Sequence, residues 1–297
     1  MKKILFKGVG TAIITPFTTD DEINFEEFGK IIDSQIENKV AAIIVCGTTG
    51  EASTMTLEER KAAIKFAVEK VSGRIPVIAG TGGNCTKSAV QMTQYAESIG
   101  VDGALVVTPY YNKTTQAGLI EHYKLIANST NLPIILYNVP GRTGINIAPE
   151  TAKELSKIEN IVAIKEASGY ISQVAELKNL CGDDLNIYSG NDDQITSVLA
   201  CGGIGVISVL SNIMPEYTHN IVEDFMNGNI EESVNAQIKV IPLVKALFCE
   251  VNPIPVKAGM NMIGWNVGNP RLPLIEMSDK GKERLQKEIT FMMKDLG

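Results

Sequence analysis

The run IVAIKEAS, residues 161–168, starts as a buried strand and then places a lysine, Lys165, at its fifth position. The first four residues are apolar, which is the composition of a parallel strand covered on both faces. Burying an ammonium group is costly, so a lysine in such a run needs an explanation. Similar runs recur along the whole chain, and their recurrence determines the predicted fold.

Eight short apolar, β-branched runs alternate with stretches of helical periodicity. The runs cover residues 8–17, 41–47, 76–81, 102–109, 133–138, 161–168, 186–190 and 205–209. Because this alternation is typical of βα units, eight of them predict an α/β fold, the (β/α)8 TIM barrel. A doubly wound sheet is the alternative. However, the glycine-rich stretch GTGGN at 80–84 follows the third run, not the first, and lacks the GxGxxG spacing.

The βα pattern ends near residue 225, and helical patterns cover residues 229–250, 252–264 and 278–297. We therefore expect residues 1–225 to form a barrel catalytic domain and residues 226–297 a C-terminal helical domain. A Gly/Pro-rich link at 264–274 separates the last two helical patterns.

Composition and charge exclude several classes of function. The 297-residue chain is 44% hydrophobic, and its net charge of −7 disfavours nucleic-acid binding. The sequence contains no run of 18 apolar residues, so we expect no membrane span. The five cysteines form no CxxC pair and there are only two histidines, so we expect reduced thiols, a cytoplasmic protein and no metal site.

Lys165 is the first candidate for catalysis. Strand residues alternate between the two faces of a barrel, so Ile161, Ala163, Lys165 and Ala167 are expected to share the inner face. Active sites of this fold lie at the carboxyl ends of the strands, and the two alanines leave room there for an amine. A lysine so placed can act as a nucleophile that forms an imine with a carbonyl substrate. The alternative is a lysine that reaches solvent from the strand end.

Two further side chains are expected at the same mouth. Tyr137 is fifth in its run, as Lys165 is in the next, so the phenol and the amine should lie at equal depth. A phenol there can transfer protons, although a lone tyrosine is more commonly part of a core. Arg142 follows in a loop, where it can bind a carboxylate in a bidentate manner or lie on the surface.

Other turns at the mouth refine the type of substrate. Thr48 and Thr49 lie in the turn GTTG after the second run, where amides and hydroxyls can bind a carboxylate. A strand–helix turn with threonine capping is the alternative. The acids of SGNDD at 189–193 disfavour a phosphorylated substrate. Tyr110 and Tyr111 lie on a loop after the fourth run, a position typical of an interface.

Motifs along nearly the whole chain resemble those of the dihydrodipicolinate synthase family of pyruvate-dependent class I aldolases. They are GTTGE at 47–51, AGTGGN at 79–84, TPYYN at 108–112, YNVPGRT at 137–143, IKEASG at 164–169, SGND at 189–192, GVISV at 205–209 and NPIPVK at 252–257. The resemblance implies Schiff-base condensation of pyruvate with L-aspartate 4-semialdehyde in lysine and diaminopimelate biosynthesis. It also implies a homotetramer, a dimer of dimers, with no metal or organic cofactor.

The resemblance assigns a role to each candidate residue. Lys165 is the imine-forming lysine, Tyr137 transfers protons, and Thr49 links Tyr137 to Tyr111 of a neighbouring subunit. Arg142 holds the carboxylate of the semialdehyde. The pyruvate pocket is formed by Thr48, Thr49 and the backbone of Ile207, with Gly190 nearby.

The resemblance also implies a regulatory site for lysine, from which this chain departs. Asn84 and Tyr110 match the lysine-sensitive pattern, but Arg60 replaces a histidine or glutamate and Ser88 replaces a glutamate. Without an acidic partner for an ammonium group, we expect weak or absent inhibition by lysine.

Two other functions remain open from the sequence. The first is a related keto-acid lyase acting on sialic acid or on a 2-keto-3-deoxy sugar acid. Such lyases have GSTGE in place of GTTGE and lack GRT after YNVP, whereas this chain has GTTGE and GRT. The second is a non-catalytic barrel that serves as a ligand-binding or scaffolding protein.

Overall fold

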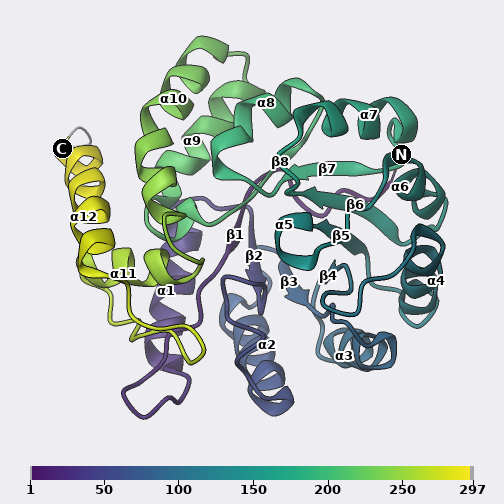
Figure 1. The fold of residues 1–297 in the computed structure, drawn as a ribbon, viewed down its shortest axis with the longest axis horizontal. Coiled ribbons are helices and arrows are strands. Elements are labelled where there is room, and N and C mark those ends of the chain that lie inside the picture. The colour runs from purple at the N-terminus through teal and green to yellow at the C-terminus, as the bar shows by residue number, and fades with distance from the viewer. Residues whose placement is uncertain (1, 295–297) are drawn as a thin grey trace.

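Each of the eight predicted apolar runs forms one strand of a closed parallel barrel in the computed structural model, which describes residues 2–294. The strands are β1 (Gly8–Ala12), β2 (Ala42–Val45), β3 (Val77–Gly80), β4 (Gly103–Val107), β5 (Ile134–Asn138), β6 (Ile161–Glu166), β7 (Asn186–Ser189) and β8 (Gly205–Ser208). They follow one another around the barrel in chain order, and β8 pairs with β1 (Figure 1). The predicted TIM barrel is confirmed.

Helices surround the barrel and continue beyond it (Figure 1). They are α1 (Phe25–Glu37), α2 (Leu57–Val71), α3 (Thr86–Ser98), α4 (Gln116–Ala127), α5 (Pro140–Thr143), α6 (Pro149–Ser156), α7 (Ile171–Cys181), α8 (Ile195–Ala200), α9 (Pro215–Met226), α10 (Ile230–Leu247), α11 (Ile254–Met262) and α12 (Asp279–Lys294). Local chemistry fixes their ends: α2, for example, begins at a capping box formed by Thr56 and Glu59.

The two faces of the strands separate the apolar core into an inner and an outer layer. The inner layer includes Val162 and Ala163 of β6, whereas Ile161 and Ile164 pack outside, against the helices. The predicted inner position of Ile161 is therefore wrong. The pairing of β5 with β6 shifts at this point and skips Val162, which reverses the alternation before Ala163.

The C-terminal helices lie together on one side of the barrel (Figure 1). A single apolar cluster contains Val9 and Ile43 of the barrel together with Val240 of α10, Met260 of α11 and Leu285 of α12. All five side chains are fully buried. The helical segment therefore shares a core with the barrel.

One buried ion pair also joins the C-terminal segment to the barrel. Nζ of Lys257 in α11 lies 2.8 Å from Oε1 of Glu51, and both side chains are completely inaccessible. The ammonium also donates to the carbonyls of Thr15 and Asn269 and lies over the ring of Phe17. Burial lowers the pKa of Lys257, and the attraction of Glu51 opposes that effect.

Within residues 2–294, no helix has both the length and the apolar character needed to cross a membrane.

Candidate active site

Lys165 lies in a layer with two tyrosines inside the barrel. It pairs in register with Tyr137 on β5 and with Tyr188 on β7, so the predicted equal depth of the amine and the Tyr137 phenol is confirmed. The ammonium lies 4.4 Å from the centre of the Tyr137 ring, and the lysine is 5% exposed. The amine thus lies against an aromatic face and away from bulk water.

Gly190, which follows β7, leaves the space that the lysine side chain occupies. A Cβ atom at this position would lie 3.1 Å from Cε of Lys165 and 2.6 Å from Cβ of Ala167. The amide of Gly190 donates to the carbonyl of Glu166, which fixes the turn beside β6. Any larger residue at position 190 would displace the lysine or the end of its strand.

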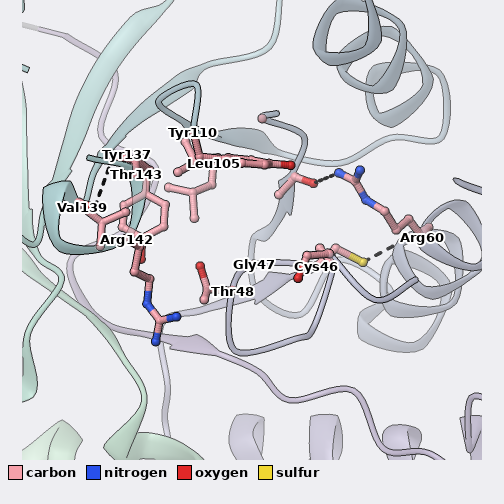
Figure 2. Close-up of a pocket in the computed structure, with 15 residues that line it drawn as sticks. Cys46, Gly47, Thr48, Arg60, Leu105, Tyr110, Tyr137, Val139, Arg142 and Thr143 are labelled. Carbon is pink, nitrogen blue, oxygen red and sulfur yellow. Dashed lines mark hydrogen bonds between the residues drawn. The ribbon is translucent and has the colours of Figure 1, made fainter. Parts of the chain in front are cut away.

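A cavity of about 240 Å³ opens at the mouth next to this layer. Thr48, Tyr137 and Arg142 are among the residues that line it, so the structure brings these three predicted residues together (Figure 2). Lys165 does not line the cavity itself but contacts the Tyr137 ring, which does. A small carboxylate in the cavity would meet hydroxyl groups and two guanidinium groups, those of Arg60 and Arg142.

The turn that carries Thr48 and Thr49 follows β2. Thr48 is half-buried and faces the cavity, whereas Thr49 is 3% exposed. The amide of Glu51 donates to the carbonyl of Thr48, and Glu51 has a positive φ of 55°, so the chain reverses tightly here. The hydroxyl of Thr49 accepts a hydrogen bond of 3.1 Å from Nδ2 of Asn252.

Arg142 lies in the single helical turn α5, after β5. The base of this loop is held by Asn138, whose amide donates to the buried carboxylate of Glu166 and whose Oδ1 accepts from the amide of Ile147. The Arg142 side chain is exposed, and among residues 2–294 it donates one hydrogen bond, of 3.2 Å, to the carbonyl of Asn252. The remaining N–H groups of the guanidinium face a site that can receive a carboxylate.

The remaining predicted residues lie around this centre. Ile207 is fully buried in β8 and belongs to the inner layer. Tyr111 is 92% exposed with a φ of 70°, so its phenol projects away from its own chain. Arg60 and Tyr110 line the cavity, and Figure 2 shows Arg60 and Arg142 at opposite sides of it. The lining does not include Asn84 or Ser88.

Sequence reasoning missed three residues of the site. Tyr188 packs beside Lys165, and its hydroxyl donates to the carbonyl of Phe6. In the sequence, Asn252 appeared only as the first residue of the NPIPVK motif and had no predicted role. Asp192 is buried and accepts hydrogen bonds from Ser208 and from two backbone amides of the β8 end. Burial raises the pKa of Asp192, and these hydrogen bonds oppose the rise.

Among residues 2–294, no group of three or more histidine, cysteine or acidic side chains could hold a metal ion.

Comparison with known proteins identifies the family. The profile of the Dihydrodipicolinate synthetase family matches residues 5–292. The 4-hydroxy-tetrahydrodipicolinate synthase of Caldicellulosiruptor saccharolyticus is 59% identical over 285 residues, which are 96% of each chain. The solved dihydrodipicolinate synthase of Thermotoga maritima is 44% identical, with a TM-score of 0.95 over 97% of this chain and 99% of that one.

A lysine-bound structure of the enzyme from Cyanidioschyzon merolae is 39% identical, with a TM-score of 0.94 over 97% of this chain and 98% of that one. The match of the profile to nearly the whole chain, the high identity and the likeness to solved structures agree with the barrel fold. The chain therefore belongs to the dihydrodipicolinate synthetase family.

Proposed function

We propose that Lys165 is the nucleophile of the reaction of this family. As a member of the family, the chain is a lyase that condenses pyruvate with L-aspartate 4-semialdehyde to 4-hydroxy-tetrahydrodipicolinate, the first committed step of the diaminopimelate route to lysine. The observation that carries the assignment is the buried contact of 4.4 Å between the Lys165 ammonium and the Tyr137 ring. It places a nucleophile beside a group that can move protons.

The chemistry then follows in balanced steps. The neutral amine of Lys165 adds to the ketone carbon of pyruvate, and loss of water gives the imine. Removal of a methyl proton gives an enamine, whose carbon attacks the aldehyde of the second substrate. The amine of that substrate then displaces Lys165 from the imine carbon, which closes the ring and frees the enzyme. Tyr137 is the group placed to carry protons in the imine and enamine steps.

The other residues have binding roles in this proposal. Thr48 and Thr49, with the backbone of Ile207, bind the pyruvate carboxylate, and Gly190 leaves room for the substrate-bearing lysine. Arg142 binds the carboxylate of the semialdehyde. Its exposed guanidinium, which lines the same cavity as Tyr137, supports this role.

Borohydride reduction in the presence of pyruvate tests the assignment of Lys165. Reduction converts the imine into a stable adduct, which peptide mapping should locate on Lys165. The same mapping contains its own control, because Lys257 is also buried but is held in an ion pair and should stay unmodified. An adduct on another lysine, or an adduct that persists in Lys165→Ala, would refute the assignment.

We propose further that the protein is a homotetramer built from dimers in which Tyr111 of one subunit reaches the site of its neighbour. The 92% exposure of this phenol on a mouth loop supports that role. Mixing inactive Lys165→Ala subunits with weakly active Tyr111→Phe subunits tests it. If Tyr111 acts across the interface, mixed dimers contain one complete site and activity rises. If it acts within its own chain, mixing restores nothing.

Two lesser proposals complete the description. The predicted C-terminal domain, residues 226–297, of which 295–297 lie outside the described residues, is an appendage of the barrel, as the shared apolar cluster supports. The protein acts in the cytoplasm, since all five cysteines are free thiols and a reducing compartment preserves them.

A further inference from the structure

We propose that Asn252, which lies between α10 and α11, is a positioning residue that orients Thr49 and Arg142. The inference rests on the proposed function, because it concerns how the semialdehyde and its protons are handled at the Lys165 site. It assigns to the C-terminal segment a part in building the barrel mouth.

Asn252 contacts two predicted site residues that are far away in the sequence. Its side-chain Nδ2 donates to the hydroxyl of Thr49 at 3.1 Å, across 203 residues. Its backbone carbonyl accepts from Nη2 of Arg142 at 3.2 Å, across 110 residues. Asn252 is 5% exposed and Thr49 is 3% exposed, so water competes little for the bond between them.

The hydrogen bond from Asn252 determines which further hydrogen bonds the Thr49 hydroxyl can form. A hydroxyl has one donor and two acceptor positions. Nδ2 of Asn252 uses one acceptor, which leaves Thr49 with one donor and one acceptor. This pair is what a proton relay between two phenols requires, since the group must accept from one neighbour and donate to the other. Asn252 therefore orients the Thr49 hydroxyl for the proposed link between Tyr137 and Tyr111, without touching a reacting atom.

The bond to Arg142 fixes the second substrate contact. The Arg142 side chain is exposed, and the Asn252 carbonyl is its one hydrogen-bond partner among residues 2–294. A guanidinium anchored at one N–H keeps its other donors free for a carboxylate and loses less freedom when it binds one. One residue thus links the carboxylate-binding group to the relay.

Asn252 also carries an unused acceptor. Its Oδ1 is buried and has no hydrogen-bond partner among the described residues. Buried polar atoms are rarely left unpaired, so this acceptor is available to a water molecule or to another polar group.

The position of Asn252 is itself fixed from both sides. Five residues later, Lys257 forms the inaccessible ion pair with Glu51, which lies two residues after Thr49. The two ends of the Asn252–Thr49 bond are therefore held by a second connection nearby. Such support is expected where the geometry of a hydrogen bond affects function.

A double-mutant cycle tests the proposal. Asn252→Ala should lower kcat/KM for the semialdehyde by about tenfold, the cost of one buried hydrogen bond at a site of reaction. In a Thr49→Val background the same substitution should change the residual activity by less than about twofold, because its target is gone. A full tenfold effect in that background would overturn the proposal.

Asn252→Asp is measured in parallel, because it keeps the shape and the backbone carbonyl but removes the donor. It should lose at least as much activity as the alanine variant, and wild-type activity would contradict the assigned role. Asn261→Ala is the matched control in the same segment. Among the described residues its side chain bonds only to the backbone of Val267 and Gly268, so kcat/KM should stay within about twofold of the wild type.

Borohydride trapping separates the two possible failures. A pyruvate adduct on Lys165 in all variants, with no effect of Asn252, would refute the positioning role alone. No adduct in the wild-type protein would refute the proposed function of Lys165.

Discussion

The buried pair of Lys257 and Glu51 should dominate the coupling between the C-terminal helices and the barrel. All three N–H donors of the ammonium are used, by Glu51 Oε1 at 2.8 Å and by the carbonyls of Thr15 and Asn269. The second carboxylate oxygen accepts from the amide of Arg271. Lys257→Met leaves an unpaired buried carboxylate, which costs about 3–5 kcal/mol. For a chain of this length that loss corresponds to a fall in Tm of about 5–8 °C.

Calorimetry and urea unfolding of three variants test this reasoning. Lys257→Met should show the full loss, whereas Lys257→Met combined with Glu51→Leu should recover most of it, because no charge is then left unpaired. Lys124→Met removes the partner of an exposed pair with Glu121 and should cost less than about 1 kcal/mol. A double variant no more stable than Lys257→Met would refute the argument. Activity measured well below Tm should also fall in Lys257→Met, since Glu51 lies beside Thr49.

Three further predictions concern other parts of the chain. Gly190→Ala should reduce kcat by about 10- to 100-fold through displacement of Lys165, whereas Gly83→Ala, whose Cβ would meet no atom within 4 Å, should leave it unchanged. Burial lowers the pKa of His122 from 6.5 to about 4, so stability should fall as pH drops through that window, by up to about 3 kcal/mol, and urea titrations of His122→Gln should show a flatter dependence. Lysine titration should give half-inhibition no lower than the millimolar range, because the Arg60 guanidinium at the cavity repels an ammonium group.

The sequence predicted the barrel well because its parallel strands are covered on both faces and therefore appear as continuous apolar runs. Counting positions within two such runs also placed Tyr137 and Lys165 at the same depth, and this held because the register shift offsets the one-residue difference between the two runs. The same counting failed for Ile161. A register shift depends on how two strands pair, and the alternation within one strand carries no sign of it.

Contacts between segments far apart in the sequence were the part of the site that could not be predicted. Asp192 was seen only as an acid near the mouth, yet it is buried and bonded to the end of β8. Asn252 belongs to a segment whose sequence pattern predicts a helix, and its partners are 110 and 203 residues away. Such bonds depend on which distant segments the closed barrel brings together, and no local sequence pattern encodes that.

The two substrates depend on different parts of this architecture. Lys165 and Tyr137 lie on adjacent strands, whose separation is fixed by the backbone hydrogen bonds of the barrel. Arg142 lies in a segment after the strands, and its hydrogen-bond partner Asn252 comes from the C-terminal segment. A perturbation of residues 226–297 that leaves the barrel folded should therefore impair the semialdehyde step more than imine formation with pyruvate. On this reasoning, the helical segment is retained at the barrel mouth because the second substrate requires it.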